Sequence, residues 1–242
     1  MKNDSVIKIE DLFFAHGKKE VLKGVSLEIP KGQIWGLVGP NGTGKTTLLK
    51  ILAGLYKADK GTVLINDVDM KNAPNSIYNE IGVMIEDTAS YENLSGFENV
   101  KIIANMYNFD HKDEKIKELF KLADLEKAMY DKVKTYSLGM KQRLGLIMTL
   151  LNEPKVLLLD EPTNGLDIDG IRTVREIIMT YASQKSATVI ISSHIVSELK
   201  MVCDHIAFMI NGKVRSVNDI NDFEKISIED YYVNLVEVNK CA

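Results

Sequence analysis

The N-terminal part of the chain alternates apolar and polar positions in two stretches, residues 5–10 (SVIKIE) and 21–29 (VLKGVSLEI). This alternation has the period of a β-strand with one buried face, so both stretches are predicted to be strands. The run IWGLV at 34–38 is short and apolar, as expected of a strand buried on both faces. In TTLLKILAGL, at 46–55, the apolar residues have helical spacing. The pattern therefore predicts a β-rich opening that leads into a strand, a loop and a helix.

Beyond this opening, two further apolar runs, at 61–65 and 81–85, predict strands joined by a polar connection at 66–76. From Glu98 to Asp131 the spacing becomes helical and β-branched runs disappear, which predicts a helical insert.

Strands and helices then alternate: strand 156–160, helix 171–184, strand 188–192, helix 197–203 and strand 205–210. Asn211-Gly212, between two apolar runs, predicts a hairpin turn after the last of these strands. The alternation favours an α/β fold with right-handed crossovers between parallel strands.

These elements predict a single domain over residues 1–242. Its parts are a core of residues 1–88 and 138–215, a helical insert at 89–137 and a short, polar C-terminal tail at 216–242 with one amphipathic stretch. The fold class is α/β: a core of mostly parallel sheet with helices, an N-terminal antiparallel β subdomain and the inserted α-helical subdomain.

Charge and composition narrow the function classes. Lys and Arg total 30 against 34 Asp and Glu, so no basic excess points to nucleic acid, and we expect no nucleic-acid partner. Apolar runs such as 144–151 fall far short of the roughly 20 residues that a membrane-spanning helix needs. The N-terminus does not resemble a secretory signal, and the chain has only 2 cysteines, so a reducing cytoplasm is the expected compartment.

A phosphate-binding loop follows the buried strand at 34–38. Its pattern G-x-x-x-x-G-K-[ST] is met by Gly39, Pro40, Asn41, Gly42, Thr43, Gly44, Lys45 and Thr46. Glycines let backbone N–H groups turn toward phosphate oxygens, and the N-terminus of the next helix adds positive charge. Lys45 is predicted to reach the β- and γ-phosphates, Thr46 to ligate Mg²⁺ and Thr47 to contact the α-phosphate.

Two carboxylates end the apolar strand VLLLD at 156–160. In an open parallel sheet, ligands bind beyond the carboxyl ends of the strands, where Asp160 lies. We therefore predict Asp160 as a Mg²⁺ ligand and Glu161 as the group that polarises the water attacking the γ-phosphate.

Three segments after the phosphate loop resemble the ATP-binding cassette family, the nucleotide-binding subunits of ABC transporters: YSLGMKQR at 136–143, LLLDEPTNGLD at 157–167 and SSH at 192–194. The resemblance covers nearly the whole chain. It implies that Ser137 and Gly139 bind the γ-phosphate of ATP held by the other protomer, although Ser137 alone would suit an ordinary helix N-cap. It also implies that His194 contacts the γ-phosphate and Glu161, and that Asp167 belongs to a loop crossing between protomers.

Two positions depart from the family pattern. Glu86 stands where the family usually has a glutamine, and we expect it to act as the metal-side sensor. His16 stands where an aromatic residue normally stacks on adenine, with Phe14 as a competing candidate. Phe13 and Phe14 could instead simply pack in the β-rich opening.

IGVMIED at 81–87, YSLGMKQR and DEPTNGLDIDGI at 160–171 resemble the exporter ATPases of bacitracin and lantibiotic resistance or immunity. The resemblance implies an ATP- and Mg²⁺-dependent ATPase that forms a head-to-tail homodimer, or a heterodimer with a paralogous cassette. Membrane-spanning permease subunits would hold it at the cytoplasmic face of the membrane, through a groove near Glu86 and residues 88–100. The alternatives are a cassette ATPase acting on nucleic acid or ribosomes and an uptake-type ABC ATPase.

Overall fold

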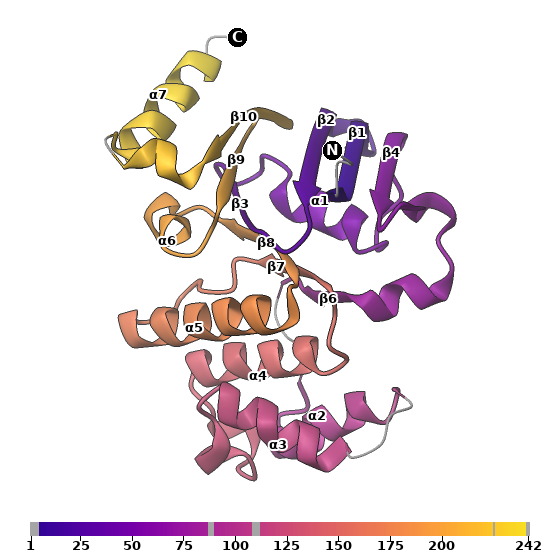
Figure 1. Ribbon diagram of the computed structural model, residues 1–242, viewed down its shortest axis with the longest axis vertical. Helices are drawn as coiled ribbons and strands as arrows, with labels where there is room; N and C mark the ends of the chain where they lie inside the picture. The colour runs from indigo at the N-terminus through magenta and orange to yellow at the C-terminus, as the bar shows by residue number, and fades with distance from the viewer. Residues whose placement is uncertain (1–4, 87–89, 108–111, 225, 241–242) are drawn as a thin grey trace.

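The computed structural model describes residues 5–86, 90–107, 112–224 and 226–240. The N-terminal part forms an antiparallel sheet, at the upper right of Figure 1, in the order β2, β1, β4, β5. Its strands are β1 (Ser5–His16), β2 (Lys19–Pro30), β4 (Lys60–Ile65) and the short β5 (Val68–Asp69). The predicted β-rich opening is confirmed, with strands longer than the alternating stretches because their ends pair across a turn at residues 17–18.

A second sheet crosses the middle of the molecule in the order β10, β9, β3, β8, β7, β6. Its strands are β3 (Ile34–Val38), β6 (Ile81–Met84), β7 (Val156–Asp160), β8 (Thr188–Ser193), β9 (His205–Ile210) and β10 (Lys213–Asp219). All neighbours pair in parallel except β9 and β10, which form the predicted hairpin. Asn211 and Gly212, with φ of 51° and 78°, supply the left-handed backbone of its turn.

The parallel strands are buried on both faces, and successive side chains enter two different hydrophobic clusters. In β7, Val156 and Leu158 pack with the N-terminal sheet and α1, whereas Leu157 and Leu159 pack with the other helices. This follows from the two-residue period of a strand, and it explains why these strands appear in the sequence as continuous apolar runs.

Helices cover the sheet and extend below it in Figure 1, with α4 next to α5, and α2 and α3 furthest from the N-terminal sheet. The α-helices are α1 (Lys45–Leu52), α2 (Gly96–Ala104), α3 (Lys112–Leu122), α4 (Leu138–Leu150), α5 (Ile168–Lys185), α6 (Val196–Lys200) and α7 (Ile228–Lys240). Short 3₁₀ helices occur at Met70–Asn72, Asn75–Glu80, Glu126–Ala128, Val133–Thr135 and Ile220–Phe223. Among the described residues, no helix combines the length and the apolar character that crossing a membrane would require.

The C-terminal segment differs from the polar tail expected from the sequence. β10 continues to Asp219, and α7 then packs against α6 and β9. Phe208 of β9 contacts the rings of Phe223, Tyr231 and Tyr232, with centroids 5.3 to 6.1 Å apart. A few well-placed aromatic residues are therefore enough to hold a segment that is polar on average.

Candidate functional site

The phosphate loop occupies the predicted place, between the end of β3 and the start of α1. Gly44 has a φ of 102°, a left-handed conformation that glycine adopts without strain, and it immediately precedes the helix. Gly39 lies so close to β9 that a Cβ atom there would be 2.1 Å from the carbonyl oxygen of Met209. Glycine is thus needed at one position for backbone conformation and at the other for space.

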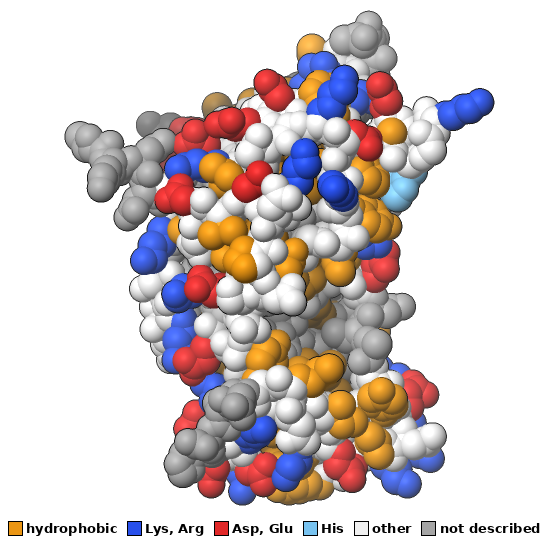
Figure 2. Space-filling model, turned by 90° about the vertical axis from the view of Figure 1, so that its right-hand side faces the viewer, with side chains coloured by type: hydrophobic (Ala, Val, Ile, Leu, Met, Phe, Trp, Pro, Cys, Tyr) orange, Lys and Arg blue, Asp and Glu red, His pale blue; other side chains and the backbone are white. Residues whose placement is uncertain are grey.

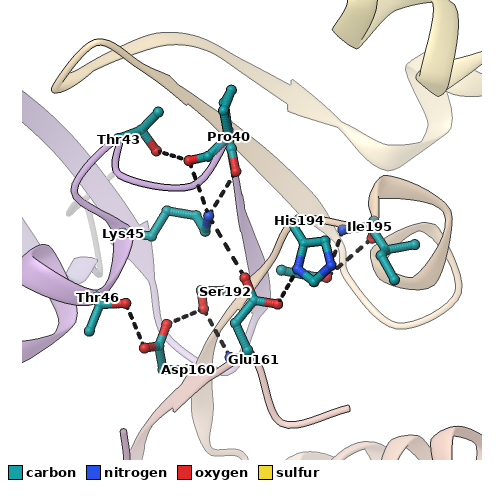
Figure 3. A network of polar contacts seen from close by, with 11 residues as sticks. Pro40, Thr43, Lys45, Thr46, Asp160, Glu161, Ser192, His194 and Ile195 are labelled. Carbon is teal, nitrogen blue, oxygen red and sulfur yellow. Dashed lines mark hydrogen bonds and ion pairs between the residues drawn. The ribbon is translucent and has the colours of Figure 1, made fainter. Parts of the chain in front are cut away.

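Lys45 is buried, with 6% of its side chain exposed, and its ammonium group folds back over its own loop. Nζ donates to the carbonyl oxygen of Gly39 at 2.7 Å and lies 3.7 Å from Oε1 of Glu161 (Figure 3). Burial lowers the pKa of Lys45, and the charges of Glu161 and Asp160 oppose that shift. These partners compensate the charge of the buried cation.

Asp160, the last residue of β7, links the helix and the neighbouring strand. Its Oδ2 accepts a hydrogen bond from the Thr46 hydroxyl at 2.7 Å, and its Oδ1 accepts one from the Ser192 hydroxyl. Ser192 is the register partner of Asp160 in the parallel pair β7 and β8. The carboxylate is therefore fixed from both sides at the carboxyl edge of the sheet.

Glu161 points away from Asp160 because its backbone is left-handed, with a φ of 47°. Its N–H donates to the Ser192 hydroxyl at 3.0 Å, and its Oε2 lies 2.8 Å from Nδ1 of His194. In Figure 3 the Glu161 carboxylate stands between the Lys45 ammonium and the His194 ring. The structure thus brings together three predicted site residues from α1, β7 and the loop after β8.

A pocket of about 320 Å³ opens beside this network. It is lined by Asn41, Gly42, Gly44–Thr47 and Glu161, and on another side by His16 and Lys19–Val21. Phe14 does not line it; its ring stacks on Tyr56, with centroids 5.4 Å apart. Of the two candidates for the adenine contact, His16 is the one that borders the pocket.

Ser137 and Gly139 lie elsewhere, at the N-terminal end of α4, and neither lines this pocket. The Ser137 hydroxyl accepts the N–H of Met140 at 3.3 Å, so the residue is the helix N-cap. Tyr136 anchors this end: it is buried, its hydroxyl donates to the carbonyl oxygen of Ala128, and burial raises its pKa to about 12.

The loop 164–167 runs beside that end of α4. A Cβ at Gly165 would be 3.0 Å from Leu138, and Asp167 caps α5 by accepting the N–H of Gly170 at 2.8 Å. Two apolar side chains next to these residues are exposed, Leu138 by 51% and Ile168 by 86%. This surface presents polar and apolar groups that the described part of the chain does not cover.

Glu86 is not placed with Thr46 and Asp160. Its carboxylate pairs with the Lys50 ammonium at 2.5 Å and is 66% exposed. The contact with Lys50 was missed from the sequence, as was the contact of Ser192 with both acidic residues. Parallel pairing could have indicated Ser192, whereas nothing local indicates the partner of Glu86.

The donors at Thr46 and Asp160 suit a magnesium ion, because a hydroxyl and a carboxylate are hard oxygen ligands on neighbouring elements. Among the described residues, no cluster of three His, Cys, Asp or Glu side chains could hold a metal ion by itself. An ion here would take its remaining ligands from phosphate oxygens and water, as Mg²⁺ does in nucleotide sites.

Three features define a phosphate-loop nucleotide-binding protein: a glycine loop that opens a helix, a buried lysine on that helix, and a carboxylate at the end of β7 that accepts a hydrogen bond from the same helix. The family described as ABC transporter matches residues 22–164. The chain belongs to the ABC transporter family, as an ATP-binding subunit that hydrolyses ATP. The family resemblance and the fold class predicted from the sequence are therefore both confirmed.

Individual proteins agree with this assignment. The lantibiotic transport ATP-binding protein SrtF of Streptococcus pyogenes is 37% identical over 97% of this chain and 99% of its own. The bacitracin transport ATP-binding protein BcrA of Bacillus licheniformis is 37% identical over 98% of this chain and 78% of its own.

Two solved structures share the fold. An ATP-binding subunit of an ABC transporter has a TM-score of 0.85 and 25% identity, covering 96% of this chain and 99% of its own. A dimeric ATP-binding cassette bound to ADP and phosphate has a TM-score of 0.79 and 24% identity, covering 88% and 98%.

Proposed function

We propose that this ATPase drives an exporter of peptide antibiotics, of the bacitracin or lantibiotic class, in resistance or immunity. The observation that carries the ATPase part is the Glu161 carboxylate held between Lys45 and His194, beside the phosphate loop. The substrate class is supported by relatives named for bacitracin and lantibiotic transport. The transported molecule would contact the membrane subunits, and the cassette would supply the energy of ATP hydrolysis.

Each residue of the network has a defined task in hydrolysis. Lys45 leaves the carbonyl oxygen of Gly39 and binds the β- and γ-phosphates, with Thr47 at the α-phosphate. Glu161 orients a water molecule and accepts its proton as the oxygen attacks the γ-phosphorus and the bond to ADP breaks. His194, already hydrogen-bonded to Glu161, holds that carboxylate and contacts the γ-phosphate.

Thr46 and Asp160 would hold Mg²⁺, and Glu86 would act as the metal-side sensor after leaving its contact with Lys50. A bound ion neutralises charge on the β- and γ-phosphate oxygens. The Thr46 hydroxyl would ligate it through an oxygen lone pair while its hydrogen remains donated to Asp160.

A second cassette completes the site. Ser137, Gly139 and Asp167 lie on an uncovered surface away from their own phosphate loop, so they can act only on ATP held by another protomer. The N-terminus of α4 suits a phosphate because its N–H groups and dipole attract negative charge. ATP therefore joins two cassettes head to tail, as a homodimer or with a paralogous partner.

Membrane-spanning subunits dock between the core and the helical insert at 89–137, which places the ATPase at the cytoplasmic face of the membrane. A recess of about 320 Å³ lies there, between β6 and helices α2 and α4, lined in part by Val83, Ile103 and Met148. Figure 2 views this side and shows hydrophobic side chains above and below a recess across the middle. Thr88 and Ala89, at the start of the expected contact segment, lie outside the described residues.

The test is co-expression with candidate membrane subunits in cells challenged with bacitracin, with a lantibiotic and with an unrelated antibiotic. We expect survival of the peptide antibiotics, co-purification with the membrane subunits, and loss of protection but not of co-purification in Glu161→Gln. Equal survival with the wild type and Glu161→Gln would contradict an ATP-driven exporter. Uptake of a solute by the reconstituted complex would contradict the direction of transport.

A further inference from the structure

The contact between Lys50 and Glu86 ties α1 to the segment after β6. The two charged groups are 2.5 Å apart, and the hydrogen bond from Lys50 to Glu86 is the main reason why the pKa of Lys50 is raised. Lys50 has only 15% of its side chain exposed, so its ammonium has few alternative partners in water. Glu86 has a left-handed backbone, with a φ of 63°, which an L-residue adopts only when its surroundings hold it there.

Lys50 stands four residues after Thr46 on the same helix, so both side chains occupy one face of α1, about one turn apart. Thr46 binds Asp160 on β7 and Lys50 binds Glu86 after β6, and these two strands are neighbours in the sheet. From one face of α1, Thr46 therefore reaches the end of β7, at the pair that would bind the metal, and Lys50 reaches the segment after β6, at Glu86.

We propose that Lys50 is a positioning residue that competes with the nucleotide-bound metal ion for the carboxylate of Glu86. The inference rests on the proposed metal-side role of Glu86. Before metal and nucleotide bind, the Lys50 ammonium holds the Glu86 carboxylate away from the metal site. When Mg²⁺ binds with ATP, the carboxylate would leave Lys50 for the ion. An amide at this position would bind Lys50 only weakly, so the competition is specific to the carboxylate that this chain carries.

Lys50 already has a second partner beside Glu86. Its ammonium lies 5.3 Å from the centroid of the Tyr56 ring, within the range of a cation–π contact. Tyr56 stacks in turn on Phe14, whose ring is 4.8 Å from that of His16 at the edge of the nucleotide pocket. The ammonium therefore keeps a partner when the Glu86 carboxylate moves to the metal.

The test is the effect of metal on nucleotide affinity, measured by calorimetry with adenylyl imidodiphosphate in Mg²⁺ or in EDTA. The dissociation constant in EDTA divided by that in Mg²⁺ gives the contribution of the metal to binding. Because the metal-free nucleotide is more negative than its Mg²⁺ complex, a lost lysine charge can change this ratio directly, and the Glu86→Gln background and a second lysine control for that effect. We expect Lys50→Met to raise this ratio roughly two- to fivefold, the range for a partly exposed ion pair, and Lys50→Arg to keep the wild-type value. In a Glu86→Gln background, Lys50→Met should leave the ratio unchanged.

Lys57→Met is the matched control, because it removes the same charge from an exposed lysine shortly after α1. An equal rise in Lys57→Met, no rise in Lys50→Met, or the same rise in the Glu86→Gln background would overturn the proposal. Should Glu86→Gln lower the ratio while Lys50→Met does nothing, the metal-side role of Glu86 survives and only the competition fails. Should neither substitution change it, the metal-side role fails as well.

Discussion

The edge of the sheet that carries Asp160 and Glu161 and the N-terminal end of α4 differ in how fully the folded chain satisfies their polar groups. At the sheet edge, Lys45, Asp160 and Glu161 all have partners within the chain. At α4, Ser137 caps its own helix, and exposed apolar side chains surround it. Under the proposed function, the sheet edge is the half of an ATP site that is charge-compensated within the chain, and the α4 surface is the half that would bind ATP carried by another protomer.

The largest expected effect tests the catalytic half. Glu161→Gln should reduce the rate of ATP hydrolysis by roughly 10²- to 10⁴-fold, because the amide cannot accept the proton of the attacking water. ATP binding should persist. Because the nucleotide is not cleaved, the protein should accumulate as a dimer, which size-exclusion chromatography with Mg²⁺ and ATP would detect. A variant that remains monomeric at saturating nucleotide would break the comparison, since the α4 surface would then have no partner.

Next in size is the loss of nucleotide affinity in Lys45→Ala, expected to be roughly 100-fold or more. The variant removes charge-assisted hydrogen bonds to phosphate and takes away the cation that faces the Glu161 carboxylate beside the pocket. Calorimetric titration with ATP measures the effect, with Lys57→Ala as the control for charge. Wild-type affinity in Lys45→Ala would mean that ATP does not bind in the pocket beside the phosphate loop.

Gly139→Asp tests the α4 surface. A side chain fits there, because the nearest atom to an added Cβ is 3.7 Å away, but its charge would repel a phosphate. We expect hydrolysis to fall by roughly tenfold or more while the monomer binds ATP as before. Mixing this variant with Lys45→Ala should restore part of the activity, because one of the two sites in the mixed dimer is then intact. No restoration would argue against a shared site.

The smallest expected effect separates His16 from Phe14. Stacking of one ring contributes about 0.5–1.5 kcal/mol, so His16→Ala should weaken ATP binding roughly two- to tenfold. Phe14→Ala should lower the melting temperature instead, since its ring packs on Tyr56. Calorimetry and thermal unfolding of both variants give the answer, and the reverse result would assign the adenine contact to Phe14.

The sequence was most informative where a structure depends on neighbouring residues. The phosphate loop, the strand ending at Asp160 and the Asn211-Gly212 hairpin are all fixed by local backbone and periodicity. The contacts of Ser192 and Lys50 join residues 32 and 36 positions from their partners, so they exist only once the strand order is known. The amphipathic stretch of the tail forms α7, but its packing could not be predicted, because its aromatic residues matter only with Phe208 opposite them.

Met209, behind the phosphate loop, sets a limit on which mutations the chain tolerates. Its carbonyl oxygen would lie 2.1 Å from a Cβ at Gly39, and its Cε 3.1 Å from one at Gly44. In a survey of all single substitutions, alanine at Gly39 should therefore be rejected for lack of space, and alanine at Gly44 for its left-handed backbone, before any question of phosphate chemistry arises. Variants that regain activity despite alanine at Gly39 would be expected to carry a second change in the hairpin of β9 and β10, which contains Met209, and not in the nucleotide pocket.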